Sequence, residues 1–171
     1  MVVLLERGAS FSSQSQKIRW SSAGAENLPL SKEDDMPDYD SIQIGDGATL
    51  SHKITEEDVE TYAKLTGDYN PLHIDSEYAG KTKFGKRVVH GMLVASFIST
   101  MVGTVFPGEG ALYLGQEIKF RKPVFINDII QVKTEVTHKV DSSKMLEMKT
   151  TITNQRGETL ITGKARVTWA E

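Results

Sequence analysis

One short segment of this 171-residue chain places an acid and an imidazole where they could transfer protons. Asp68 and His73 are five residues apart, and Gly67 and an Asn-Pro step accompany them. Glycine and proline end helices, so both side chains should lie on a turn between apolar segments. Such a pair could hold one water molecule, with one group removing its proton while the other supplies a proton elsewhere. This chemistry is general acid–base catalysis.

The same segment also has a purely structural interpretation. Aspartate is common in turns because its side chain bonds to the local backbone, so Asp68 could simply cap the turn. His73 would then be a core histidine whose hydrogen bonds the protein satisfies. Spacing alone favours this structural interpretation, and a functional one needs further support.

A second candidate site is the His90-Gly91 pair, which precedes a long apolar segment. The first amides of a helix lack intrahelical acceptors and lie at the positive end of the helix dipole. The Gly91 amide could therefore polarise a substrate carbonyl as it becomes an enolate. Alternatively, Gly91 only lets a strand-to-helix turn close tightly, a common use of glycine.

The elements that carry the first pair follow from capping residues and breaks. Thr55 and Asp58 resemble a capping box and predict a helix that Gly67 ends. Pro71 lacks an N–H, so residues 68–75 are expected to form a loop. A strand is expected at residues 48–54 and a short helical turn at residues 76–79.

Residues 91–106 are apolar on nearly every helical face, so other structure should surround this helix. After Pro107 and Gly108 the apolar residues recur every second position, which predicts strands. A sheet curled around a central helix satisfies both patterns, and this arrangement is the α+β hotdog fold. Pairing of exposed edge strands would give a homodimer. The expected strands cover residues 113–120, 130–136, 146–152 and 161–169.

Composition excludes several classes of function. A net charge of −3 gives no electrostatic case for binding nucleic acid or a membrane surface. The absence of cysteine excludes disulfides, thiolate nucleophiles and cysteine-ligated zinc. No apolar run reaches the roughly 20 residues of a transmembrane helix. His73 and Asp75 lack a third ligand at metal spacing, and no glycine-rich phosphate loop follows a strand, so neither a metal nor a cofactor is expected.

The first 40 residues differ in composition from the rest, and we expect them to be disordered. Residues 1–24 hold six serines, three basic residues and one acid, a balance typical of an organelle transit peptide. A plain disordered tail is the alternative. Residues 31–40 are acidic and contain Pro37, which predicts a linker before a domain at residues 41–171.

Beyond these patterns, the chain resembles a known family. Residues 62–79 read YAKLTGDYNPLHIDSEYA and are similar to the signature of the MaoC-like R-specific enoyl-CoA hydratases. The resemblance continues through VVHGML at 88–93, YLGQ at 113–116 and FRKPV at 120–124, and covers roughly residues 45–169. The length and the transit-like start also resemble mitochondrial 3-hydroxyacyl-thioester dehydratases of type 2.

The resemblance implies a hotdog dimer that hydrates trans-2-enoyl thioesters of CoA or acyl carrier protein reversibly, without metal or cofactor. It implies that Asp68 and His73 activate the water and that the Gly91 amide binds the carbonyl. Asn70 and Ser99 would support the site. A type 2 dehydratase would act in the mitochondrial matrix in fatty acid synthesis; a cytoplasmic location is the alternative.

Further residues and two other functions stay open from the sequence. Met101, Val105, Leu112 and Tyr113 are candidates for an acyl-chain slot, although apolar residues at such spacing usually form a core. Arg121 and Lys122 could meet phosphate or an acidic partner, or be a solvated basic pair. The protein could instead be a hotdog acyl-thioesterase or a non-catalytic acyl-thioester-binding protein, but the Asp68 and His73 motif argues against both.

Overall fold

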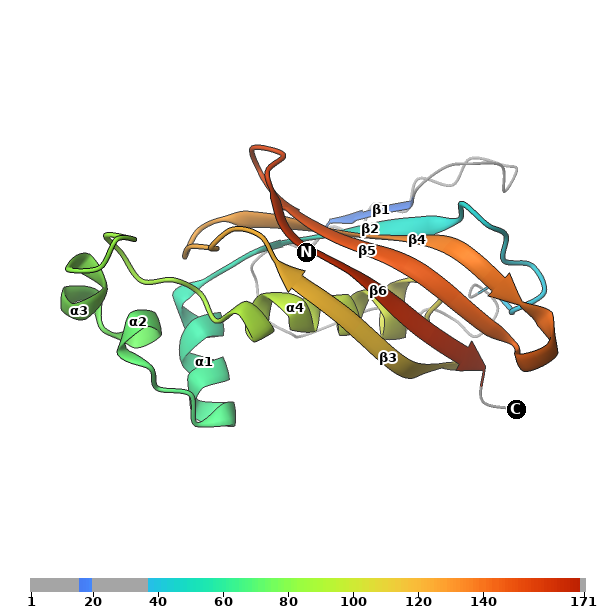
Figure 1. Ribbon diagram of the computed structural model, residues 1–171, viewed down its shortest axis with the longest axis horizontal. Helices are drawn as coiled ribbons and strands as arrows, with labels where there is room; N and C mark the ends of the chain where they lie inside the picture. The colour runs from blue at the N-terminus through green and yellow to red at the C-terminus, as the bar shows by residue number, and fades with distance from the viewer. Residues whose placement is uncertain (1–15, 20–36, 170–171) are drawn as a thin grey trace.

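A six-stranded sheet arches over helix α4 (Figure 1). The computed structural model describes residues 16–19 and 37–169 of the chain. The strands are ordered β1-β2-β4-β5-β6-β3, and every neighbouring pair is antiparallel except β1 with β2. The strands are β1 Gln16–Arg19, β2 Gly47–Lys53, β3 Ala111–Phe120, β4 Ile129–Val140, β5 Met145–Asn154 and β6 Thr159–Trp169. The prediction of an α+β fold with a sheet around a central helix is confirmed.

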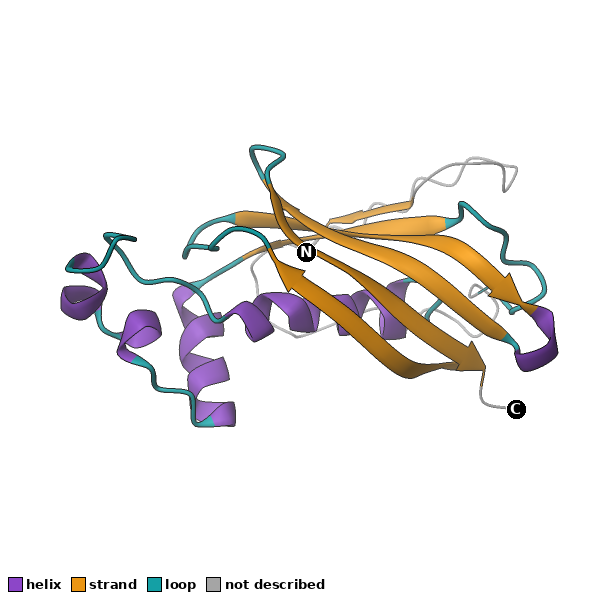
Figure 2. Cartoon of the chain, in the orientation of Figure 1, coloured by secondary structure: helices purple, strands orange, loops and turns teal. Residues whose placement is uncertain are grey.

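Most of the helical structure lies at one end of the sheet. The short helices α1, α2 and α3 gather beside the N-terminal end of α4, outside the sheet (Figure 2). The helical segments are α1 Glu56–Thr66, α2 Pro71–Ile74, α3 Ser76–Gly80, α4 Gly91–Thr100, the π-helical turn η2 Met101–Val105 and the 3-10 turn η3 Asp141–Ser143. None of these helices is long and apolar enough to cross a membrane.

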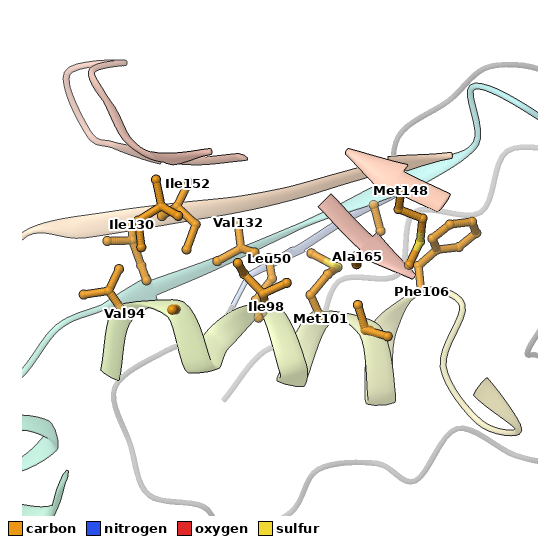
Figure 3. Close-up of a cluster of buried hydrophobic side chains, with 14 of the residues drawn as sticks. Leu50, Val94, Ile98, Met101, Phe106, Ile130, Val132, Met148, Ile152 and Ala165 are labelled. Atoms are coloured by element: carbon orange, nitrogen blue, oxygen red, sulfur yellow. The ribbon is translucent and has the colours of Figure 1, made fainter. Parts of the chain in front are cut away.

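The core lies between α4 and the face of the sheet above it. Val94, Ile98 and Met101 point from α4 and η2 toward the sheet (Figure 3). They meet aliphatic side chains of alternate strand residues, among them Val132 and Ile152. Because successive residues of a strand point to opposite faces, the period of two in the sequence placed these side chains on the core face.

The central helix departs from its prediction in two ways. The regular α-helix ends at Thr100 and continues as the π-helical turn, whereas one helix was expected over residues 91–106. One face of α4 is also open, because Met92, Ser96 and Ser99 are exposed. The expectation that other structure surrounds this helix is therefore wrong for the single described chain. The reason is that the sheet covers only one side of it.

Helix α1 begins and ends where the sequence predicts. The Thr55 side chain accepts from the Asp58 amide, the Asp58 carboxylate accepts from the Thr55 amide, and Gly67 ends the helix with φ 76°. The expected loop at residues 68–75 contains the short helix α2 instead. Pro71 occupies its first position, where no intrahelical N–H bond is lost, so proline favours this helix rather than preventing it.

The domain begins earlier than expected. Tyr39, assigned to the linker, is only 3% exposed and packs edge-on against Trp169. Its buried hydroxyl donates to Asp141, and burial raises the pKa of Tyr39 to about 12. Residues 16–19, expected to be disordered, form β1 beside β2. The predicted transit peptide otherwise lies outside the described residues.

Candidate active site

The imidazole of His73 is held in a defined tautomer. Its Nδ1 lies 2.6 Å from the carbonyl oxygen of Val88. A carbonyl oxygen only accepts hydrogen bonds, so Nδ1 carries the proton and Nε2 of the neutral ring has a lone pair. His73 lies in α2, and that lone pair can accept a proton from water.

Asp68 lies in the loop between Gly67 and α2, and its side chain is exposed. The carboxylate accepts from the Asn70 amide at 3.3 Å, and the Asp68 amide donates to the Thr66 hydroxyl at 3.3 Å. The contact to the carboxylate is long for a hydrogen bond, so most of the carboxylate's capacity to accept stays available. The structure therefore combines the two predicted interpretations, because Asp68 helps to form the turn and still presents its oxygens.

His90 and Gly91 form the start of α4. His90 is the N-cap residue, but its side chain makes no capping bond to the first turn of the helix. The N-terminal amides thus keep the capacity to bind an acceptor that a capping side chain usually takes. Gly91 also lies close beneath an aromatic ring, since a Cβ built at this position would approach the Phe120 ring to 2.8 Å.

One cavity contains both His73 and Gly91. Its volume is about 330 Å³, and most of its lining is apolar. Arg121 and Lys122 are the charged residues of the lining. The remaining lining residues are Phe84, Val88, Val89, Val94, Phe120, Pro123, Val124 and Ile161. An apolar cavity with a base at one point and a backbone donor at another can bind and polarise an acyl group.

The two basic residues of the lining each contact a polar side chain of the protein. Arg121 donates from Nε to the Thr162 hydroxyl at 3.0 Å. Lys122 lies 2.7 Å from Glu158. That hydrogen bond, with others from Asn154 and Arg156, lowers the pKa of Glu158 to about 2.

Three side chains at the site could act as metal ligands. Each of Asp68, His73 and His90 has one possible ligand atom, and these three atoms lie within 4.8 Å of one another. His73 Nδ1 and His90 Nε2 already bond to backbone carbonyls. A metal bound here would have to use the remaining ring nitrogens, and one of these, His90 Nδ1, is buried. The arrangement suits water better than a metal ion.

Of the two residues expected to support the site, one lies near His73 and the other lies away from the cavity. Asn70 caps α2, accepting from the Leu72 amide at 3.0 Å, and so shapes the turn that carries His73. Ser99 lies on the exposed face of α4 and does not line the cavity.

None of the four predicted acyl-chain residues lines this cavity. Met101 is fully buried in the core, so its assignment to a substrate slot is not supported: the side chain fills the space between helix and sheet. Val105 and Tyr113 pack partly against the core, and Leu112 is exposed on β3. Burial raises the pKa of Tyr113 to about 12, so this phenol remains a donor, here to Gln116.

Sequence reasoning missed the side chain of His90 and the partner of His52. His90 was noted only as the neighbour of Gly91, although its ring contacts His73. His52 pairs with Asp58 at 2.8 Å and stacks on Phe97. The capping box at Asp58 was visible in the sequence, but the strand-to-helix angle that brings His52 to it was not.

Comparisons with known proteins agree with this arrangement. A family profile described as "MaoC like domain" matches residues 43–157. The (R)-specific enoyl-CoA hydratase of Aeromonas caviae is 39% identical over 127 residues, which cover 74% of this chain and 95% of that protein. The mitochondrial 3-hydroxyacyl-[acyl-carrier-protein] dehydratase of Arabidopsis thaliana is 42% identical over 89 residues, 52% of each chain.

The fold is also similar to solved structures of related proteins. The unliganded R-hydratase of Pseudomonas aeruginosa superposes with a TM-score of 0.74 at 37% identity. The match covers 78% of this chain and 85% of that one.

Proposed function

Since this chain belongs to the MaoC-like domain family, we propose that it is a hydro-lyase that adds water reversibly to trans-2-enoyl thioesters. The product is an (R)-3-hydroxyacyl thioester, and the reverse direction is a dehydration. The observation that carries the proposal is that His73 and Gly91 line the same cavity, with Asp68 beside the imidazole.

In the proposed mechanism, the thioester carbonyl accepts a hydrogen bond from the Gly91 amide. This donor stabilises the enolate oxygen that develops when C3 is attacked, and loss of one such donor costs about 10²–10³-fold in other enzymes. A water molecule is held between Asp68 and His73 Nε2. Its oxygen bonds to C3 as the C2–C3 π electrons move into the enolate, and one of its protons passes to the Asp68 and His73 pair. The pair then delivers one proton to C2, so that its own protonation state is restored. Dehydration reverses these steps.

The substrate is proposed to be a thioester of CoA or of acyl carrier protein. Both carriers present a phosphopantetheine arm, and Arg121 and Lys122 in the cavity lining suit its negative charge. The relatives include proteins named for each carrier. Hydration assays with both thioesters at several chain lengths would identify the preferred one.

We expect the protein to be a homodimer that pairs along β3. This strand lies at one edge of the sheet, and its Leu112 and Leu114 are 53% and 54% exposed. Met92 on the open face of α4 is also 54% exposed. A second copy would cover the edge strand and these apolar side chains. Val105, Leu112 and Tyr113 remain proposed acyl-chain residues, and such a slot would lie near this interface.

The dimer can be tested at the edge strand. Leu114→Arg places a charge where the second copy would pack, so sedimentation should show mainly monomer while the wild type sediments as a dimer. A wild-type monomer would contradict the proposed assembly.

For location, we propose the mitochondrial matrix, because the serine-rich basic start suits a transit peptide. Mass spectrometry of the protein from the organelle should find residues 1 to about 25 absent, since transit peptides are removed on import. An intact N-terminus, or recovery in the cytoplasm alone, would contradict this proposal.

The activity itself is tested with crotonyl-CoA. Addition of the wild-type protein should remove the enoyl absorbance and yield the (R)-3-hydroxy product without release of thiol. Release of free CoA would instead indicate a thioesterase, and binding without turnover would indicate a non-catalytic acyl-thioester-binding protein.

A further inference from the structure

We infer that His90 is a positioning residue that joins the loop of Asp68 to the helix that begins at Gly91. The inference rests on the proposed function, because it concerns how two parts of that site, the loop of Asp68 and the start of α4 at Gly91, are held relative to each other. His90 is only 2% exposed, and the proposed mechanism gives its side chain no proton to transfer. Its contacts extend to both halves of the site.

The first contact is with the loop. His90 Nε2 lies 2.9 Å from the carbonyl oxygen of Asp68, so Nε2 carries the proton and donates it. The other hydrogen bonds at Asp68 measure 3.3 Å. The bond from His90 is therefore the shortest that holds this residue, and it fixes the backbone from which the carboxylate projects.

The second contact is with the base. The rings of His90 and His73 are 4.0 Å apart between centroids, inclined at 35°. Tyr62 of α1 lies 5.0 Å from the His90 ring. His90 thus lies against α1 and α2 while its own backbone begins α4, and α2 and α4 carry His73 and Gly91 of the cavity lining.

Three hydrogen bonds of Val88 and His90 join the catalytic turn (residues 68–74) to the segment before α4, and Arg87 adds a fourth, longer one to the Ile74 carbonyl. The Val88 amide donates to the Leu72 carbonyl at 3.1 Å, and the Val88 carbonyl accepts from His73 at 2.6 Å. The His90 ring makes the third bond, to Asp68. The first two bonds hold α2, and only the third reaches the residue that carries the proposed acid.

The second ring nitrogen of His90 agrees with this assignment of the donor. Within the described residues its Nδ1 is buried and has no hydrogen-bond partner. A proton on Nδ1 would lack an acceptor there, which is costly in a buried site, so the geometry favours the tautomer with the proton on Nε2.

Two substitutions separate the hydrogen bond from the packing of the ring. His90→Gln keeps an N–H donor near the position of Nε2 but loses the aromatic ring, whereas His90→Phe keeps a ring but removes the donor. We expect His90→Phe to lower kcat for crotonyl-CoA by about 10²-fold with little change in KM, since misplacement of a catalytic group by about 1 Å costs this much. His90→Gln should recover at least about ten-fold of that loss.

Equal activity of the two variants, or a higher activity of His90→Phe, would overturn the inference. A double-mutant cycle adds a second check. If His90 acts through Asp68, His90→Phe should cost little further activity in the Asp68→Asn background, whereas additive losses would contradict the coupling.

A spectroscopic measurement tests the hydrogen bond without any assay of turnover. Long-range ¹H–¹⁵N correlation spectra of the wild-type histidine rings should show His90 protonated at Nε2 and His73 at Nδ1. Protonation of His90 at Nδ1 would overturn the inference even if the enzyme is active. Correct tautomers in a protein without hydratase activity would overturn the proposed function and leave the hydrogen bond in place.

Discussion

Two Asp–His pairs in this protein differ in what their side chains bind. His52 and Asp58 bond directly to each other at 2.8 Å, and Asp58 also accepts from the Thr55 amide at 2.7 Å. Among the described residues, no hydrogen bond or ion pair joins Asp68 to His73. Instead, backbone carbonyls hold the rings of His73 and His90.

The difference is consistent with a structural role for the first pair and with the proposed catalytic role for the second. A carboxylate and an imidazole that satisfy each other cap a helix and have little capacity left for substrate. When a backbone carbonyl orients the imidazole, its second nitrogen remains available for water. We therefore expect the first pair to affect stability and the second to affect catalysis.

The largest expected effect is on catalysis. Asp68→Asn and His73→Asn should each lower kcat by about 10²–10⁴-fold, because general acid–base catalysis contributes this much. Both residues are at least partly exposed, so the thermal unfolding temperature should hardly change. Crotonyl-CoA hydration and circular dichroism measure the two quantities.

The matched controls are Asp58→Asn and His52→Gln in the other pair. At a temperature where they remain folded, each should keep kcat near that of the wild type. Full activity in the Asp68 or His73 variant, or a large loss in the controls, would contradict the division of roles.

The next effect concerns the free energy of unfolding. Thr55→Ala removes the side chain that accepts from the Asp58 amide, and loss of an N-cap typically costs about 1 kcal/mol. Urea unfolding should reveal this loss, with little change in kcat. A change below roughly 0.3 kcal/mol would mean that the cap contributes little here.

Low pH should reduce the stabilisation of the fold by the His52–Asp58 pair. Burial raises the pKa of Asp58, but hydrogen bonds from His52 and Thr55 outweigh burial and hold the pKa below its ordinary value. A carboxyl whose pKa is lower in the folded state stabilises the fold above its unfolded pKa, about 3.9. This contribution is lost as the pH falls through the folded-state pKa. Asp58→Asn should remove that part of the pH dependence in urea titrations, whereas an unchanged slope would contradict it.

The smallest effect is expected at the fourth histidine. His138 is exposed, and its Nδ1 is 3.9 Å from Glu147, which also pairs with Lys164. His138→Ala should change the free energy of unfolding by less than about 0.5 kcal/mol and leave kcat unchanged. A larger loss of stability would show that even a distant, exposed pair contributes to the fold.

Much of the fold was predictable because its causes are local. The capping box at Thr55 and the glycine at position 67 set the limits of α1, and the period of two located the strands. The role of Pro71 was misjudged because proline breaks a helix interior but favours its first position. The open face of α4 was misjudged for another reason, since an apolar sequence does not tell which element covers each side.

Residue type and spacing are enough to recognise the acid, the imidazole and the glycine before the apolar helix, and therefore the chemistry that is available. Which atoms of these groups can act depends on how the chain folds. The tautomer of His73 depends on the Val88 carbonyl, 15 residues away, and the position of Asp68 depends on His90, 22 residues away. Hydrogen bonds between segments so distant in sequence depend on how the helices pack, and no local pattern specifies that packing.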